Sequence, residues 1–225
     1  MTQNLLDAIE VETAPNPTHA VIWLHGLGAD GNDFVPVVPE LQLQAAPPIR
    51  FIFPHAPVMP VTINGGMAMR AWYDISNTDL VRREDAQGIR QSEIAVRAFI
   101  EREAGRGIPS SNIVLAGFSQ GCAMTLHAGL RFDQGLAGLV ALSGYLPLAD
   151  TVEQERHEAN QETPIFMAHG TQDPVVPFER AQASRQQLID LGYSVDFQAY
   201  PMPHSVCLEE ITAIGTFLRQ VFKPS

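Results

Sequence analysis

Short apolar runs alternate with longer amphipathic stretches along most of the chain. Five of these runs have four to seven residues and are flanked by Gly, Pro or Asn, as is typical of buried parallel strands. They cover residues 20–24, 49–53, 113–116, 136–142 and 165–168. Residues 194–200 alternate polar and apolar side chains as a less buried edge strand does, and residues 9–12 are a second candidate edge strand.

Helical periodicity fills the gaps between these runs. In residues 85–103, four apolar side chains share one helical face, and glycines follow at the end: Ile89, Val96, Phe99 and Ile100, then Gly105 and Gly107. Further helices are predicted over residues 122–130, 178–191 and 208–222. This alternation predicts an α/β fold with a mostly parallel central sheet and helices on both faces. With 225 residues, 45% of them hydrophobic, residues 1–225 are expected to form a single domain.

Charge and cysteine usage restrict the chemistry. Fourteen Lys and Arg against 25 Asp and Glu leave a net charge of −11 without a basic cluster, so nucleic acid is not expected as a partner. No apolar run reaches the roughly 18 residues of a membrane-spanning helix, and residues 1–16 do not resemble a signal peptide. We therefore expect a cytoplasmic protein without stable membrane insertion. Cys122 and Cys207 show no metal-binding spacing, so two buried thiols and no metal site are predicted.

A candidate nucleophile lies in Gly117-Phe118-Ser119-Gln120-Gly121. This segment fits Gly-x-Ser-x-Gly, a sharp strand-to-helix turn that exposes its serine. A tight turn with an incidental serine is the alternative. A predicted strand precedes the motif and a predicted helix follows it, which is the context that the motif requires, so we expect Ser119 to be the nucleophile.

The order of residues along the chain selects a base for Ser119. In this architecture an Asp or Glu and then a His follow the serine, which leaves out the three histidines that precede it. His127 lies in the helix after the motif, His157 in a polar stretch, and His169 ends a predicted strand, where capping or packing explains it better. His204, between the last strand and the last helix, is the expected base, and an exposed loop histidine is the alternative.

Asp173 is the expected acid, because it lies in a loop at the carboxyl end of the strand predicted over residues 165–168. Asp150 and Glu153 are its rivals. Asp150 follows no clear strand, and a role as N-cap of the next helix would explain it. The same N-cap alternative applies less well to Asp173, since the next helix is predicted to begin several residues later.

A hydrolase needs two N–H donors for the negative charge that develops on the substrate carbonyl oxygen. The backbone N–H of Gln120 follows the nucleophile directly and is one candidate. Leu27 N–H is the other, because three glycines in residues 26–31 allow that loop to turn its amides inward. The same loop matches a dinucleotide-binding pattern, but Arg50 occupies the place where that pattern requires an acidic residue, so no cofactor is expected.

Five segments in this order resemble the carboxylesterase and acyl-protein thioesterase family of α/β-hydrolases: residues 23–28 (WLHGLG), 70–74 (RAWYD), 117–121 (GFSQG), 169–177 (HGTQDPVVP) and 203–205 (PHS). The resemblance implies a compact serine esterase without a large lid domain. It implies Ser119, Asp173 and His204 as the triad, and Leu27 and Gln120 as the oxyanion donors. Cys122 stands where some members have a further glycine, which makes the chain look more like a bacterial carboxylesterase.

One long segment, residues 54–80, contains three prolines and no sustained period. Its many apolar side chains indicate that it folds over the serine and lines an acyl groove, although a loop that only packs on the sheet is the alternative. The substrate-binding candidates are Val61, Ile63, Met69 and Trp72. Such a groove would favour neutral esters of short to medium acyl chains.

The expected function is therefore cleavage of small-molecule esters and thioesters through an acyl-enzyme. A lysophospholipase, an acyl-protein thioesterase and a peptidase are alternatives, because the triad does not identify the leaving group. A non-catalytic binding module with this fold is an alternative from another class. A weak homodimer is the only protein partner expected.

Overall fold

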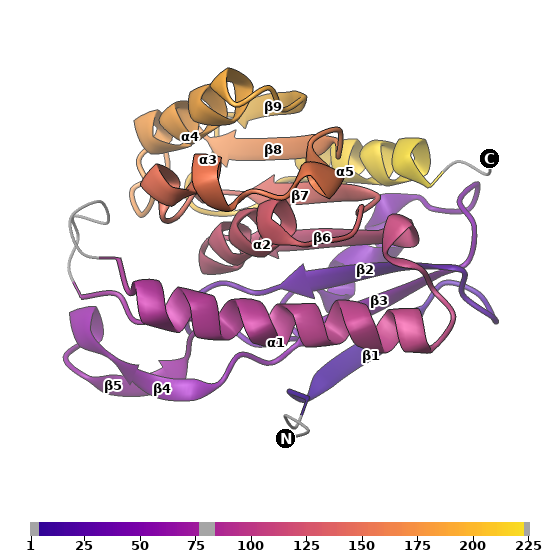
Figure 1. Cartoon of the computed structure of the whole chain (residues 1–225), viewed down its shortest axis with the longest axis horizontal. Helices are drawn as coiled ribbons and strands as arrows, with labels where there is room; N and C mark the ends of the chain where they lie inside the picture. The colour runs from indigo at the N-terminus through magenta and orange to yellow at the C-terminus, as the bar shows by residue number, and fades with distance from the viewer. Residues whose placement is uncertain (1–4, 77–83, 223–225) are drawn as a thin grey trace.

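A seven-stranded sheet runs through the centre of the molecule (Figure 1). The computed structural model describes residues 5–76 and 84–222. The strands of this sheet lie in the order β1-β3-β2-β6-β7-β8-β9. Their bounds are Ala8–Glu12 (β1), His19–Leu24 (β2), Ile49–Pro54 (β3), Ile113–Phe118 (β6), Gly138–Leu142 (β7), Ile165–Gly170 (β8) and Val195–Tyr200 (β9). Within it β1 alone pairs antiparallel, so the prediction of a mostly parallel sheet is confirmed.

Helices cover both faces of the sheet, as predicted. They are α1 (Ala86–Gly105), α2 (Gln120–Arg131), the short α3 (Val152–Glu155), α4 (Phe178–Asp190) and α5 (Leu208–Val221). Apolar residues of α1 and α2 pack in one core cluster, and those of α5 and the 3-10 helix η1 (Val35–Leu41) pack in another. None of the helices in residues 5–76 and 84–222 is long and apolar enough to span a membrane.

The central strand β2 shows why parallel strands read as unbroken apolar runs. Ala20, Ile22 and Leu24 point into the cluster under α1 and α2, whereas Val21 and Trp23 point into the cluster under α5 and η1. Because both faces are covered, every residue of β2 after His19 is buried.

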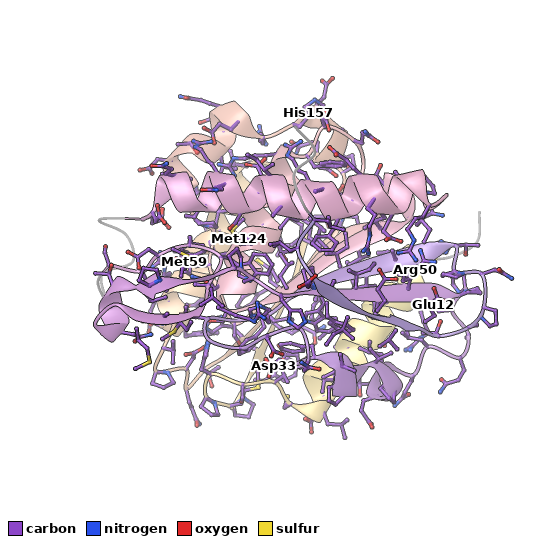
Figure 2. The ribbon with its side chains drawn as sticks, turned by 90° about the horizontal axis from the view of Figure 1, so that it is seen from below. Glu12, Asp33, Arg50, Met59, Met124 and His157 are labelled. Atoms are coloured by element: carbon purple, nitrogen blue, oxygen red, sulfur yellow. The ribbon has the colours of Figure 1, made fainter. Side chains whose placement is uncertain are left out.

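A buried arginine ties the edge strand β1 to the rest of the molecule. Arg50 on β3 donates through Nε to Glu12 Oε1 on β1 at 2.9 Å and through Nη1 to Glu103 Oε2 on α1 at 2.6 Å. Figure 2 labels Arg50 and Glu12 on these neighbouring strands. Arg50, which breaks the dinucleotide-binding pattern, therefore serves as an internal ion-pair partner.

Residues 54–80 contain more regular structure than the sequence indicates. They form the antiparallel strands β4 (Val58–Val61) and β5 (Met67–Arg70), which flank the 3-10 turn η2 (Thr62–Asn64). The expectation of a long irregular loop is wrong for this part, and residues 77–80 lie outside the described residues. The strand expected over residues 136–142 begins only at Gly138. Asp150 lies inside the 3-10 turn η4 (Ala149–Thr151), so it is not the N-cap of α3.

Candidate active site

The proposed nucleophile sits at a strained turn between β6 and α2. Ser119 has φ 56° and ψ −116°, a conformation that non-glycine residues rarely adopt, and its N–H donates to Leu142 O at 2.9 Å. A Cβ on Gly117 would lie 2.2 Å from Gly121 O, and one on Gly121 would lie 2.1 Å from Leu24 O. Both motif glycines are therefore required by close backbone contacts.

The structure brings Ser119, His204 and Asp173 together from three separate loops. His204 Nε2 lies 2.9 Å from Ser119 Oγ, and His204 Nδ1 lies 2.6 Å from Asp173 Oδ2. The Asp173 side chain has no exposed surface, whereas 16% of the His204 side chain is exposed. Because a carboxylate accepts, Nδ1 carries the proton and Nε2 is free to accept the proton of the Ser119 hydroxyl.

Asp173 is held from several directions. Its Oδ1 accepts the backbone N–H of Val175 at 2.8 Å and of Val176 at 2.9 Å. His169 Nε2 lies 2.9 Å from Val176 O and 3.4 Å from Asp173 Oδ2, so His169 packs against the acid as well as against its loop. Burial lowers the pKa of His169, which keeps its imidazole neutral beside the carboxylate.

The glycine-rich loop after β2 approaches the nucleophile from the other side. A Cβ on Gly26 would lie 3.3 Å from Ser119 Cβ, and Gly28 has φ +77° while its N–H donates to Arg70 O at 2.8 Å. Leu27, between these two glycines, and Gln120 line the same cavity as Ser119. The structure thus places both expected oxyanion donors beside the serine.

A cavity of about 480 Å³ opens at Ser119. Its walls come from the β2 loop, the β4–β5 hairpin, the nucleophile turn and the loops after β7 and β8. They consist of Leu27, Ile63, Asn64, Tyr73, Ile75, Ser119, Gln120, Tyr145 and Pro174 to Pro177. Most of these side chains are apolar, so the cavity suits an uncharged chain.

Only one of the four expected substrate-binding residues, Ile63, lines this cavity. Val61 is fully buried, and Met69 lies half-buried with its Sδ 3.3 Å from Asn64 Nδ2. Trp72 is 2% exposed and borders a different cavity, of about 410 Å³, beside α1. The assignment of Val61 and Trp72 to the wall beside the serine therefore needs correction, because both side chains turn into the interior.

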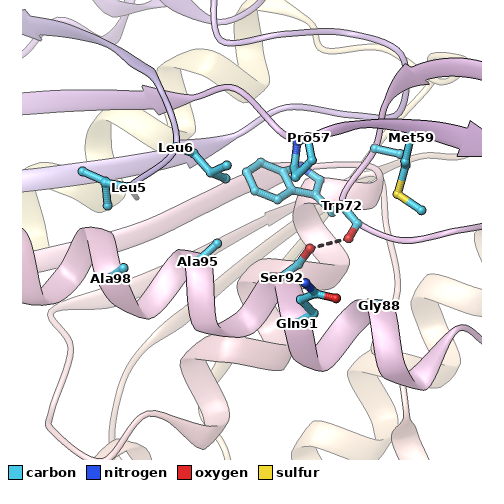
Figure 3. Close-up of a pocket in the computed structure, with 11 residues that line it drawn as sticks. Leu5, Leu6, Pro57, Met59, Trp72, Gly88, Gln91, Ser92, Ala95 and Ala98 are labelled. Atoms are coloured by element: carbon cyan, nitrogen blue, oxygen red, sulfur yellow. Dashed lines mark hydrogen bonds between the residues drawn. The ribbon is translucent and has the colours of Figure 1, made fainter. Parts of the chain in front are cut away.

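Figure 3 shows this second cavity, with Trp72 beside Pro57 and with Ser92 of α1 donating to the Trp72 carbonyl. The indole Nε1–H donates to His25 O at 2.9 Å, and the backbone N–H of Trp72 donates to Gln120 Oε1 at 2.8 Å. Trp72 is therefore joined to both sides of the nucleophile turn without lining its cavity.

Tyr145 is a cavity residue that the sequence analysis missed. It follows β7 at the carboxyl edge of the sheet, which was the available signal, and its hydroxyl lies 3.0 Å from that of Tyr73. Burial raises the pKa of both tyrosines, so both hydroxyls stay protonated. The Arg180 guanidinium lies 3.5 Å from the centroid of the Tyr145 ring, a cation–π contact that supports this wall from behind.

The two cysteines are free thiols. Cys122 is buried, and burial raises its pKa well above the usual range. Cys207 is only half-buried, so the expectation of two buried thiols holds for Cys122 alone. Across the described ranges, no cluster of three or more His, Cys, Asp or Glu side chains is arranged to hold a metal ion.

Known proteins resemble this chain over nearly its whole length. Residues 7–222 match the Phospholipase/Carboxylesterase family model. Acyl-protein thioesterase 1 of Neurospora crassa is 44% identical over 212 residues, which cover 90% of this chain and 86% of that protein. The crystal structure of Arabidopsis thaliana SOBER1 has a TM-score of 0.86 at 32% identity, covering 91% of this chain and 99% of that one. Zea mays acyl-protein thioesterase 2 has a TM-score of 0.82 at 29% identity, covering 96% and 99%. The chain therefore belongs to the phospholipase/carboxylesterase family of α/β-hydrolases.

Proposed function

We propose that this chain is a serine hydrolase that cleaves carboxylic esters and thioesters of short to medium acyl chains. The observation that carries the proposal is the continuous chain of hydrogen bonds from Ser119 Oγ through His204 to the buried Asp173. A hydroxyl becomes a useful nucleophile only when a base accepts its proton, and this geometry supplies that base at 2.9 Å.

In the proposed acylation step, Ser119 Oγ attacks the ester carbonyl carbon while its proton moves to His204 Nε2. Asp173 holds the imidazole in the tautomer that can accept this proton and stabilises the resulting imidazolium. The carbonyl oxygen becomes an oxyanion beside the N–H groups of Leu27 and Gln120. The tetrahedral intermediate then collapses, and the leaving alcohol or thiol takes the proton from His204.

Water completes the cycle in the proposed deacylation step. His204 takes a proton from a water molecule, whose oxygen attacks the acyl carbon on Ser119. The second tetrahedral intermediate releases the carboxylic acid, and His204 returns its proton to Ser119 Oγ. His204 is the residue that accepts and returns the proton in each of these transfers.

The acyl chain is proposed to lie in the cavity of about 480 Å³ beside Ser119, against Ile63 and the mainly apolar walls. Each buried methylene contributes up to about 0.8 kcal/mol, so kcat/KM is expected to rise with chain length until the cavity is filled. Cleavage of thioesters on acylated proteins is a second candidate, which the names of the similar fungal and plant proteins favour.

Acyl-enzyme trapping tests the reaction directly. The purified chain is mixed with a p-nitrophenyl ester, quenched and digested, and the peptide that contains Ser119 is examined by mass spectrometry for the added acyl group. The variant Ser119→Ala keeps the donors of the oxyanion site but loses the nucleophile, so its kcat is expected to fall by about 10⁶-fold. A variant within tenfold of the unaltered chain would overturn the serine mechanism. An unaltered chain with no turnover and no acylation would instead favour a non-catalytic binding module.

A substrate panel then separates the candidates. Acyl chains of two to sixteen carbons are offered as oxygen esters, as thioesters of a small thiol, as S-acylated peptides and as lysophospholipids, and kcat/KM is compared at equal chain length. The proposal predicts turnover of small esters and thioesters. Preference for an S-acylated peptide over the matching small thioester would instead favour the acyl-protein thioesterase candidate.

A further inference from the structure

His25 lies directly before the glycine-rich loop, and the proposed reaction gives it no role. It is 1% exposed, and both of its ring nitrogens have backbone partners. Nε2 lies 3.0 Å from the N–H of Ala56, and Nδ1 lies 2.7 Å from Gly26 O. Because an N–H can only donate, Nε2 is the acceptor and Nδ1 carries the proton that it donates to Gly26 O. Burial lowers the pKa of His25, which keeps this single neutral tautomer.

The hydrogen bond from His25 to Gly26 O also affects the direction of the Leu27 N–H. Gly26 O and the N–H of Leu27 belong to one planar trans peptide, so they point in opposite directions. When the His25 ring holds the carbonyl on its own side, it turns the Leu27 N–H to the other side. Leu27 lines the cavity together with Ser119, and a Cβ added to Gly26 would lie 3.3 Å from Ser119 Cβ.

Trp72 braces His25 against the other proposed donor. Its indole N–H donates to His25 O at 2.9 Å, and its ring centroid lies 5.5 Å from that of His25. Its backbone N–H donates to Gln120 Oε1, and Gln120 Nε2 donates to Tyr73 O at 2.7 Å. Trp72 therefore links the two proposed oxyanion donors. It bonds the side chain of Gln120, which supplies one donor, and the carbonyl of His25, which lies two residues before Leu27, the other donor.

We propose that His25, braced by Trp72, is a positioning residue that sets the direction of the Leu27 N–H in the oxyanion site. This inference rests on the proposed function, since it assigns a role in stabilising the tetrahedral intermediate on Ser119. His25 touches neither substrate nor reacting atoms, and it acts through the Gly26–Leu27 peptide.

Three substitutions of His25 separate positioning from simple packing. His25→Asn keeps an N–H near the position of Nδ1, so it retains the bond to Gly26 O and loses the acceptor for Ala56. His25→Gln places a carbonyl near the position of Nε2, so it retains the acceptor and loses the donor. His25→Leu loses both. His127→Asn is the matched control, because His127 is also a fully buried histidine but lies in α2, bonded to Glu93.

For each variant, kcat and KM are measured on p-nitrophenyl butyrate, and the melting temperature is recorded. Inhibition by an alkyl trifluoromethyl ketone is measured as well, because this compound forms a tetrahedral adduct with the serine. We expect His25→Gln and His25→Leu to lose about 10- to 100-fold in kcat with KM nearly unchanged. Inhibitor affinity should fall by the same factor. His25→Asn should recover most of both losses, and Trp72→Phe, which removes the indole N–H and part of the ring but leaves the His25 side chain in place, should lose less than His25→Leu.

Three results would overturn the inference: rescue by Gln instead of Asn, a kcat for His127→Asn as low as that for His25→Leu, or a fall in kcat that follows only the folded fraction. If His25→Leu does not fold, the comparison of Asn with Gln still decides. Failure of the proposed function is recognised separately, because the unaltered chain would then form no acyl group on Ser119.

Discussion

The cavity at Ser119 is bounded by two regions that are built in opposite ways. On the catalytic side, the turn around Ser119 is packed so closely that a Cβ on Gly117 or Gly121 would overlap backbone atoms. On the hairpin side, added Cβ atoms on Gly65 and Gly66 would meet nothing within 4 Å, and Val58 and Met67 are more than 60% exposed. The proposed reacting groups are thus held by close packing, whereas the hairpin beside the proposed acyl site has positions that are open to substitution.

The difference in packing between the nucleophile turn and the hairpin predicts which substitutions the chain tolerates. A substitution on the catalytic side disturbs buried backbone or a buried charge, and both are costly. A substitution at an exposed position of the β4–β5 hairpin, such as Ile63, changes surface that is partly in water, so it can alter the choice of acyl chain at little cost in stability. The following predictions test this contrast in order of expected effect.

The largest effect is expected from loss of the proposed base. His204→Ala should lower kcat by about 10⁴- to 10⁶-fold, because Ser119 then has no group to accept its proton. His169→Ala, the matched control, removes the histidine that lies 3.4 Å from Asp173 Oδ2 but keeps the bond of His204 to the same oxygen. It should act mainly on stability. An active His204→Ala together with an inactive His169→Ala would contradict the assignment of the base.

The next effect concerns the fold itself. In Gly121→Ala the new Cβ would lie 2.1 Å from Leu24 O, so strand β2 or the nucleophile turn must move. We expect a loss of about 3 kcal/mol or more in the free energy of unfolding, measured by urea denaturation. In Gly65→Ala the new Cβ meets no atom within 4 Å. Only the left-handed backbone conformation, at φ +67°, disfavours alanine there, and it should lower the free energy of unfolding by about 1 kcal/mol. Equal losses for the two variants would remove the contrast between the regions.

The same contrast explains how much of the molecule could be predicted from the sequence. The nucleophile turn was predictable because its close contacts demand glycine at fixed offsets from Ser119. Asp173 and His204 were predictable because the carboxyl ends of parallel strands meet at one edge, so residues in the loops after β8 and β9 converge there. These constraints are local, or they follow from topology alone.

The walls of the cavity were harder to predict. Both Val61 and Trp72 are apolar residues in a segment that passes close to the serine, and only the packing of the side chains decides that neither of them lines the cavity. Polar and apolar side chains do not alternate cleanly along hairpin β4–β5. Apolar residues occupy exposed positions, at Val58 and Met67, as well as the buried position of Val61. Tyr145 joins the wall through contacts across strands, which no spacing in the sequence records.

A smaller effect is expected from a buried carboxyl group in α5. Glu210, in the first turn of α5, is fully buried, and the described residues offer its carboxyl group no nearby hydrogen-bonding group except the backbone of Cys207. Burial raises its pKa from 4.5 to about 8. Between these two values the unfolded chain releases this proton while the folded chain keeps it, so the free energy of unfolding falls as the pH rises.

Glu210→Gln removes this titration. The melting temperature of the variant, relative to that of the unaltered chain, should therefore increase from pH 5 to pH 8 by a few degrees. Glu209→Gln changes the adjacent carboxyl group, which is exposed, and serves as the control. If both variants follow the same pH profile, the buried carboxyl group is not the cause.

The smallest effect is expected on the hairpin, and it should appear in specificity instead of stability. Ile63 is 39% exposed and lines the cavity, whereas Val58 on the same hairpin is 62% exposed and does not. Removing the outer carbons of Ile63 takes away apolar contact only for acyl chains long enough to reach it, at up to about 0.8 kcal/mol per methylene. In Ile63→Ala, kcat/KM should therefore fall up to about tenfold for the longer chains and stay unchanged for acetyl esters, while Val58→Ala leaves the whole profile unchanged. A uniform fall across all chain lengths would mean that Ile63 supports the catalytic geometry, and the two sides of the cavity would then not be independent.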